Sequence, residues 1–255
     1  MLKPYYETKL GKLYHGDCLE IMPELEPVDL VLADPPYGIT ACSWDLIIPL
    51  EPMWKHIAEV IGPNTAVIMT SGQPFASKLV MSNPKQFRYD IIWNKVLITG
   101  HLNAAKMPLR KHETILVFYN KLPTYNPQKT TGERNHKTKG SLKKSNVYGS
   151  ERRADRSDIL GSFKYPTSII EFNKIPASLV CHPAQKPVPL MKYLIKTYSN
   201  KSETVLDFAI GSGTTAIACE KLNRRWIGIE ISEEYCEIAK QRIINETRQL
   251  KLFDV

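Results

Sequence analysis

The fold class is decided by a stretch near the end of the chain, Thr204-Val205-Leu206-Asp207-Phe208-Ala209-Ile210-Gly211-Ser212-Gly213-Thr214-Thr215-Ala216. The apolar residues 204–206 predict a strand, and residues 214–222 predict a helix. Between them, Gly211, Gly213 and Ala216 follow the spacing G-x-G-x-x-G/A. Glycine allows a tight turn there and lets a ligand approach the backbone closely. Such a turn between a strand and a helix is typical of nucleotide-binding α/β folds.

An acidic residue follows this glycine loop at the distance expected for a ribose ligand. Residues 225–229 predict the next strand, and Glu230 follows it directly, 23 residues after Asp207. A carboxylate about 20 residues beyond such a loop commonly binds the two hydroxyls of a ribose. Together the two features predict a ligand that contains adenosine, and they fit a nicotinamide cofactor and S-adenosylmethionine equally well.

The other apolar segments predict alternating strands and helices. Strands are predicted at residues 28–33, 66–69, 89–93 and 114–119, and helices at 52–61, 74–81, 187–198 and 233–245. This alternation predicts a parallel, doubly wound α/β sheet. Residues 121–176 lack the periodicity, so we expect them to form an insert or small subdomain.

Composition limits the class of protein. The 255 residues are 43% hydrophobic and 24% charged, as in ordinary globular proteins. The chain has no apolar run of about 18 residues and no apolar signal core, so we expect a cytoplasmic protein. No C-x-x-C pair occurs, so we expect reduced thiols rather than disulfides or a metal site at Cys18, Cys42, Cys181, Cys219 and Cys236.

Positive charge is concentrated in one stretch. Residues 128–153 contribute +6 of the net charge of +8, because eight basic residues there are opposed only by Glu133 and Glu151. This excess suits a polyanion such as nucleic acid, and the alternative is a solvated loop. The basic residues are Lys129, Arg134, Lys137, Lys139, Lys143, Lys144, Arg152 and Arg153.

A second motif, Asp34-Pro35-Pro36-Tyr37, fits methylation of an exocyclic amine. It follows the strand at 28–33, at the edge where open α/β sheets build their sites. An exocyclic amine is a poor nucleophile because its lone pair is delocalised into the ring. The Asp34 carboxylate and the Pro35 carbonyl offer acceptors for its hydrogens, and the prolines hold them rigidly. Tyr37 offers a flat face for a base taken out of the duplex.

The order of these motifs resembles the β-class of amino-methylating DNA methyltransferases, in which the catalytic motif precedes the cofactor motif. His182-Pro183-Ala184-Gln185-Lys186-Pro187 is similar to the family's His-Pro-Thr-Gln-Lys-Pro element, and Gly16-Asp17-Cys18 is similar to its early cofactor motif. Residues 112–118 resemble another family strand. The resemblance implies a circularly permuted, Rossmann-like α/β sheet. It implies a catalytic half at 1–122, an inserted basic target-recognition region at 123–180 and a cofactor-binding half at 181–255.

The resemblance also implies ligands and residue roles. The cofactor is S-adenosylmethionine and the partner is double-stranded DNA. Asp34, Pro35, Pro36 and Tyr37 are catalytic, and the eight basic residues of 128–153 contact DNA. Lys186 is expected either at the cofactor carboxylate or capping a surface turn. The implied cofactor-binding residues are Asp17, Cys18, Asp34, Lys186, Asp207, Phe208, Gly211, Ser212, Gly213, Thr214, Glu230 and Ile231.

Several interpretations remain open on the sequence alone. Aspartate rather than serine at the start of the catalytic motif favours adenine N6 over cytosine N4. RNA and protein-glutamine methyltransferases usually place the cofactor motif first, and a nicotinamide-dependent oxidoreductase leaves residues 34–37 unexplained. A catalytically silent DNA-binding protein has no need of intact Asp34, Tyr37 and Gly211. A homodimer and a cognate restriction enzyme are further expectations from the resemblance.

Overall fold

The computed structural model describes residues 2–39, 45–133, 162–176, 180–181 and 184–253. The chain divides into two compact units, one formed by Met1–Asn126 with Ser168–Val255 and the other by Pro127–Thr167. The second unit contains an antiparallel pair, β7 (Thr130–Thr131) and β8 (Phe163–Lys164). It is shorter than the insert expected at 123–180, because β9 (Ile169–Glu171) joins the sheet of the first unit.

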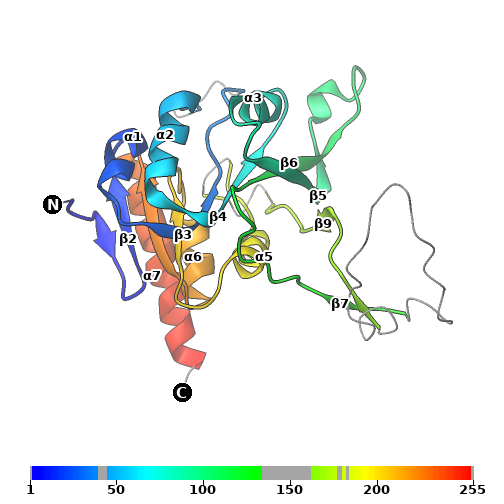
Figure 1. Cartoon of the computed structure of the whole chain (residues 1–255). Coiled ribbons are helices and arrows are strands. Elements are labelled where there is room, and N and C mark those ends of the chain that lie inside the picture. Colours follow the sequence, from blue (N-terminus) through cyan, green and yellow to red (C-terminus); the bar gives the residue numbers. More distant parts are fainter. Residues whose placement is uncertain (1, 40–44, 134–161, 177–179, 182–183, 254–255) are drawn as a thin grey trace. The chain divides into compact units, whose positions relative to one another are not determined.

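A nine-stranded sheet forms the centre of the first unit, in the order β1-β2-β11-β10-β3-β4-β6-β5-β9 (Figure 1). The five strands from β2 to β4 are parallel, as expected. β6 is antiparallel to both of its neighbours, because residues 100–109 return the chain from β5 without a crossover helix. The bounds are β1 Tyr6–Glu7, β2 Gly11–His15, β3 Val28–Ala33, β4 Ile61–Ser71, β5 Phe87–Thr99, β6 Arg110–Phe118, β10 Thr204–Asp207 and β11 Arg225–Glu230.

Helices cover both faces of this sheet (Figure 1). The side chains of β3 alternate: Leu30 and Leu32 belong to one hydrophobic core, and Val31 and Ala33 belong to the other. The first core includes α5 (Val188–Tyr198), α6 (Thr214–Glu220) and α7 (Glu233–Phe253). The second includes α1 (Cys18–Ile21), α2 (Leu50–Val60) and α3 (Phe75–Ser82). None of the helices within the described ranges is long and apolar enough to cross a bilayer.

Strands from the two ends of the chain are neighbours in the sheet. β10 pairs in parallel with β3, with Val205 opposite Leu30 and Leu206 opposite Val31. β11 pairs in parallel with β2. The carboxyl ends of β3 and β10 therefore lie side by side at one edge. This register places residues 34–37 next to the glycine loop, although some 170 positions separate the two motifs in the sequence.

Candidate active site

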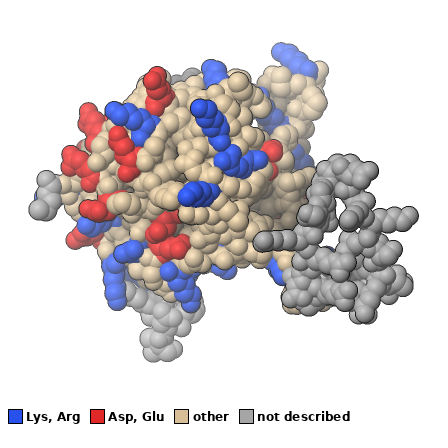
Figure 2. Space-filling model, in the orientation of Figure 1, with Lys and Arg blue, Asp and Glu red and all other residues tan. Residues whose placement is uncertain are grey.

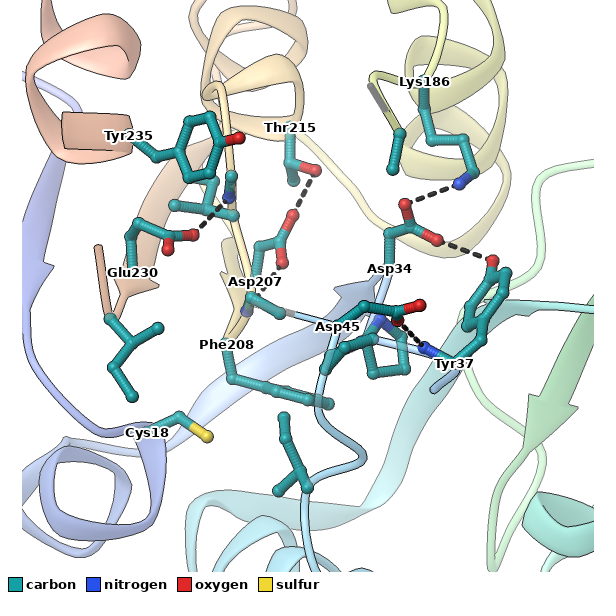
Figure 3. Close-up of a pocket in the computed structure, with 18 of the residues that line it drawn as sticks. Cys18, Asp34, Tyr37, Asp45, Lys186, Asp207, Phe208, Thr215, Glu230 and Tyr235 are labelled. Carbon is teal, nitrogen blue, oxygen red and sulfur yellow. Dashed lines mark hydrogen bonds and ion pairs between the residues drawn. The ribbon is translucent and has the colours of Figure 1, made fainter. Parts of the chain in front are cut away.

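A cavity of about 460 Å³ opens at this edge, within the usual size range of small-molecule sites. Its lining comes from the catalytic motif, the glycine loop and Lys186. Figure 3 shows Asp34, Tyr37 and Lys186 on one side, Glu230, Tyr235 and Cys18 on the other, and Phe208 between them. One cavity thus joins the two predicted halves of the site.

The Asp34 carboxylate is held by three side-chain donors, of which Figure 3 shows Tyr37 and Lys186. The Tyr37 hydroxyl donates to Oδ1 at 2.7 Å, and the Thr70 hydroxyl donates to the same oxygen. The Lys186 ammonium lies 2.5 Å from Oδ2. A carboxylate offers about four lone-pair positions. Within the described part of the chain, one acceptor position of Asp34 thus remains, on Oδ2.

Lys186 lies between two carboxylates. Its Nζ is 3.5 Å from Glu113 Oε2 in addition to its contact with Asp34. Glu113 Oε1 is 3.3 Å from Lys95 Nζ, and both lysines are buried. Burial by itself lowers the pKa of Lys186, but the charges of Asp34 and Glu113 outweigh it and raise that pKa above its usual value. Lys186 is therefore a cation at neutral pH.

Tyr37 is fixed by its ring and by its hydroxyl. The ring stacks on Phe75, with centroids 5.4 Å apart and an interplanar angle of 18°. The Lys186 ammonium lies over the ring at 5.6 Å from its centroid. Burial and the charges of Asp34 and Glu113 raise the pKa of Tyr37 well above its usual value. The hydroxyl therefore stays protonated and keeps donating to Asp34.

Asp45 holds the backbone of residues 37–39 at the end of the catalytic motif. This buried carboxylate accepts from the backbone N–H groups of Tyr37 at 2.8 Å, Gly38 at 2.9 Å and Ile39 at 2.9 Å. Gly38 has φ 67°, which a residue with a side chain rarely adopts. Ile39 and residues 46–48 then line the cavity with apolar side chains. Asp45 therefore shapes the backbone that continues from the catalytic motif.

The glycine loop forms the other side of the cavity. Gly211 N–H donates to Glu230 Oε2 at 2.8 Å, and Ser232 N–H donates to Oε1 at 2.9 Å. The backbone N–H of Ile231 also donates to this carboxylate. Because a carboxylate offers about four lone-pair positions, acceptor capacity remains for a hydroxyl. Gly213 has φ 80° and precedes α6, where an added Cβ would lie 3.1 Å from Ala239 Cβ. The glycine at 213 thus allows α7 to pack closely against the loop, and the carboxylate that an adenosine ligand needs lies beside Gly211.

Two side chains behind the loop stabilise its conformation. Arg242 of α7 donates to the Ser212 carbonyl and, at 2.8 Å, to the Ser212 hydroxyl. Asp207 accepts from Thr215 Oγ1 at 2.6 Å and from Ala209 N–H at 3.1 Å. Burial raises the pKa of Asp207 to about 7, although these hydrogen bonds act to lower it. The Asp207–Thr215 hydrogen bond connects the loop to α6, and the Arg242–Ser212 hydrogen bonds connect it to α7.

The cavity brings together all but one of the residues expected at the catalytic and cofactor sites. Gly213 is the exception: it bounds α6 and does not line the cavity. Asp17 lines the cavity and also caps α1, accepting from Leu19 N–H at 2.8 Å. Lys186 contacts Asp34 instead of capping a surface turn. The lining residues are Asp17, Cys18, Asp34, Pro35, Pro36, Tyr37, Lys186, Asp207, Phe208, Gly211, Ser212, Thr214, Glu230 and Ile231.

Of the eight basic residues expected to contact DNA, only Lys129 lies within the described residues. It belongs to the second unit, where its Nζ lies 4.4 Å from the Tyr165 ring centroid. The other seven basic residues of 128–153 lie outside the described residues, as do His182 and Pro183. The described residues include no group of three His, Cys, Asp or Glu side chains that could hold a metal ion.

Sequence reasoning missed four residues of the site. Thr70 donates to Asp34, and Asp45 accepts from the Tyr37 backbone. Glu113 forms an ion pair with Lys186, and Trp93 lines the cavity beside Glu113. Thr70 and Trp93 follow or end predicted strands, which is the only sequence signal that they carry. Their roles depend on strand pairing, because Trp93 lies directly opposite Glu113 in the β5–β6 register.

Comparison with known proteins agrees with this geometry. The model of the DNA methylase family matches residues 28–241, which is most of the chain. The type II methyltransferase M.BglII of Bacillus subtilis is 30% identical over 266 residues, which cover 93% of this chain and 70% of that protein. The chain belongs to the DNA methylase family. The methyl donor of the methylase is therefore S-adenosylmethionine, and its substrate is DNA.

Other relatives extend the comparison. The type II methyltransferase M.ScaI of Streptomyces caespitosus is 26% identical, over 97% of the methylase and 86% of that protein. The M1.HpyAVI–SAM complex superposes with a TM-score of 0.62 at 25% identity, covering 91% of the methylase and 100% of that chain. PvuII DNA methyltransferase, which is cytosine-N4-specific, superposes with a TM-score of 0.66 at 16% identity. The match covers 97% of the methylase and 95% of the PvuII chain. At that identity the PvuII likeness concerns the fold alone.

Proposed function

We propose that the methylase is site-specific and transfers its methyl group to the N6 amine of adenine, after that base has been flipped out of the DNA duplex. The observation that carries amine methylation is the Asp34 carboxylate in the cavity wall, with one acceptor position left on Oδ2. The choice of adenine rests on aspartate, rather than serine, at this first position of the motif. A charged acceptor at this position suits an amine whose lone pair must be localised on nitrogen.

The surroundings of Asp34 are suited to positioning. Tyr37 and Thr70 occupy Oδ1 and Lys186 occupies one side of Oδ2, so the carboxylate has little freedom to rotate. An amine that donates to Oδ2 is therefore held in one place. Because the pKa of Lys186 is raised, its ammonium stays charged and does not act as a base. Holding the reacting groups in line supplies much of the rate in a direct displacement.

The cofactor half of the cavity fits S-adenosylmethionine. Its sulfonium supplies an electrophilic methyl group. The remaining acceptor capacity of Glu230 suits a ribose hydroxyl, and Phe208 and Ile231 offer apolar surface to the adenine ring. Asp17 lies on the same lining and keeps a carboxylate oxygen beyond the one that caps α1. These residues bind and orient, and the substrate amine carries out the attack.

The direct test is transfer of tritiated methyl from S-adenosylmethionine to unmethylated DNA, followed by nucleoside analysis. The expected product is N6-methyladenine. N4-methylcytosine would overturn the assignment of the base and leave the family unchanged. Label in RNA or protein, and none in DNA, would overturn the assignment of the substrate.

The role of Asp34 is tested by Asp34→Asn, which keeps the shape of the side chain. Methyl transfer should fall by about 100-fold or more, because one preorganised charge is lost. DNA binding should be unchanged. Asp29→Asn is the matched control, since Asp29 lies on the same β3 strand but is exposed and, among the described residues, accepts its hydrogen bond from Thr204 N–H, away from the cavity lining. Near-normal turnover in Asp34→Asn would remove Asp34 from the mechanism.

Three wider expectations belong to the same proposal. A homodimer would appear in sedimentation velocity as twice the mass of the chain, which is 29.0 kDa. A cognate restriction enzyme would fail to cut DNA that the methylase has modified. A cytoplasmic location would place the protein with cellular DNA, and fractionation of the source cells would test it.

A further inference from the structure

The hairpin formed by residues 94–112, which we call the arm, projects from the sheet between β5 and β6 (Figure 1, upper right). Almost every residue from 96 to 112 is exposed. Leu102 in the short helix η2 (His101–Asn103) is 99% exposed, and Met107 is 50% exposed. These exposed apolar side chains add nothing to the core, and several of them in one segment form a candidate contact surface.

The β5 side of the arm bulges. Asn94 pairs with His112 and Thr99 pairs with Arg110, so four residues of β5 oppose one residue of β6. Three of the four are the exposed apolar residues Val96, Leu97 and Ile98. Val96 has φ 63°, a strained conformation for a β-branched residue. Strain and a run of exposed apolar residues together are features of functional rather than purely structural segments.

The charge of the arm has one sign. No aspartate or glutamate occurs between Asp90 and Glu113. Lys106, Arg110 and Lys111 are exposed, whereas Lys95 at the base of the arm is buried against Glu113. Figure 2 shows Lys and Arg side chains at the end of the arm. A surface that combines exposed apolar side chains with cations is complementary to nucleic acid, which presents both stacked bases and phosphates.

The arm extends from the wall of the active-site cavity. Trp93 and Glu113 lie opposite each other at its base, and both line the cavity. A base that enters the cavity remains joined to its duplex, so the duplex must lie against the surface where the cavity opens. Because the arm extends from two strands that form the cavity wall, we expect it to lie within reach of that duplex.

We propose that the arm binds the DNA duplex next to the flipped base. Lys106, Arg110 and Lys111 contact phosphates, and Leu102 inserts into the base stack and helps to open it. This inference rests on the proposed function, because it takes DNA as the partner and base flipping as the step assisted. A second copy of this chain is the competing occupant, and the experiments below separate the two.

The phosphate contacts are tested by the salt dependence of binding to a short labelled duplex. The variant carries Lys106→Gln, Arg110→Gln and Lys111→Gln. The control carries Lys3→Gln, Lys9→Gln and Lys12→Gln, which remove the same charge at exposed positions at or next to β1 and β2, at the opposite end of the strand order. The logarithmic salt slope of the arm variant should be shallower than that of the control by about 2 to 3. Equal slopes would overturn the proposal.

The apolar contact is tested by Leu102→Ala in single-turnover methylation of unmethylated genomic DNA. The rate should fall by roughly tenfold or more at saturating DNA, because unstacking one base step costs a few kcal/mol. Leu122→Ala is the control, since Leu122 is also exposed but lies outside the arm. An unchanged rate in Leu102→Ala would refute insertion.

The outcomes separate the two proposals. If the wild type methylates DNA and the arm variants behave as their controls do, the arm proposal alone fails. If the wild type transfers no methyl to DNA but binds it with an arm-dependent salt slope, the arm is supported and the proposed reaction fails. If the arm variants change the oligomeric state in sedimentation and leave DNA affinity unchanged, the arm is an interface between copies of this chain.

Discussion

The ammonium of Lys186 lies 2.5 Å from Asp34 Oδ2, and it supplies the counter-charge for that partly buried carboxylate. Lys186→Met should therefore lower turnover by about 100-fold, since small displacements of a reacting group can cost that much. The affinity for S-adenosylmethionine, measured by calorimetry, should remain near that of the wild type. A large loss of cofactor affinity with normal turnover would instead support the expected contact with the cofactor carboxylate.

A second lysine variant keeps this experiment interpretable. Removing one partner of a buried ion pair also destabilises the fold, by about 3–5 kcal/mol. Lys186→Arg keeps the charge and should recover part of the lost turnover. Lys196→Met, at an exposed position of α5, is the control for the loss of a lysine. Thermal melting of each variant then separates unfolding from loss of catalysis.

The buried carboxyl of Asp207 predicts a pH dependence of stability. Its pKa is raised by burial from 3.8 to about 7, so the folded protein binds a proton there that the unfolded chain has already lost. As the pH rises from 4 to 7, the contribution of this group to the free energy of unfolding should fall by up to about 1.4 kcal/mol per pH unit. Asp207→Asn should remove that component in urea unfolding at pH 5 and 7.5. Parallel curves for both proteins would contradict the prediction.

The pairing of β2 with β11 requires a glycine at position 11. Gly11 lies opposite Trp226, and a Cβ built on Gly11 would lie 2.2 Å from the buried indole ring. Gly11→Ala should therefore destabilise the protein by about 1–3 kcal/mol through overpacking. Gly62→Ala is the control in β4, since its added methyl meets only Thr65 Oγ1 at 3.7 Å. Urea unfolding measures both, and equal stabilities would refute the close contact.

At the scale of elements, hydrophobic periodicity predicted the positions of the longer strands and helices. The predicted strand at 28–33 is confirmed as Val28–Ala33, and the helix predicted at 187–198 is confirmed as Val188–Tyr198. β1, β2 and β9 were missed. β1 and β9 are strands of two and three residues, and the buried positions of β2 do not alternate regularly. The antiparallel direction of β6 was also missed, because hydrophobic pattern alone does not specify strand direction.

For the whole molecule, the sequence predicts a second source of DNA affinity in addition to the arm. Lys143 and Lys144 belong to the basic stretch 128–153 and lie outside the described residues. Lys143→Gln with Lys144→Gln should weaken DNA binding and reduce the salt slope by about 1 to 2. Anisotropy titrations over a range of salt concentrations measure this, with the Lys3, Lys9 and Lys12 variant as control. An unaltered slope would make this stretch a solvated loop.

The sequence by itself determined the family and the two halves of the site. Residues 34–37 and the loop at 207–214 carry their chemistry in contiguous side chains and glycines, so spacing alone identifies them. Only the tertiary structure decided that the two motifs form one cavity, because the pairing of β10 with β3 joins opposite ends of the chain. It also decided that Lys186, Glu113 and Thr70 surround Asp34. Contacts between residues distant in sequence depend on strand register and burial, which local patterns do not encode.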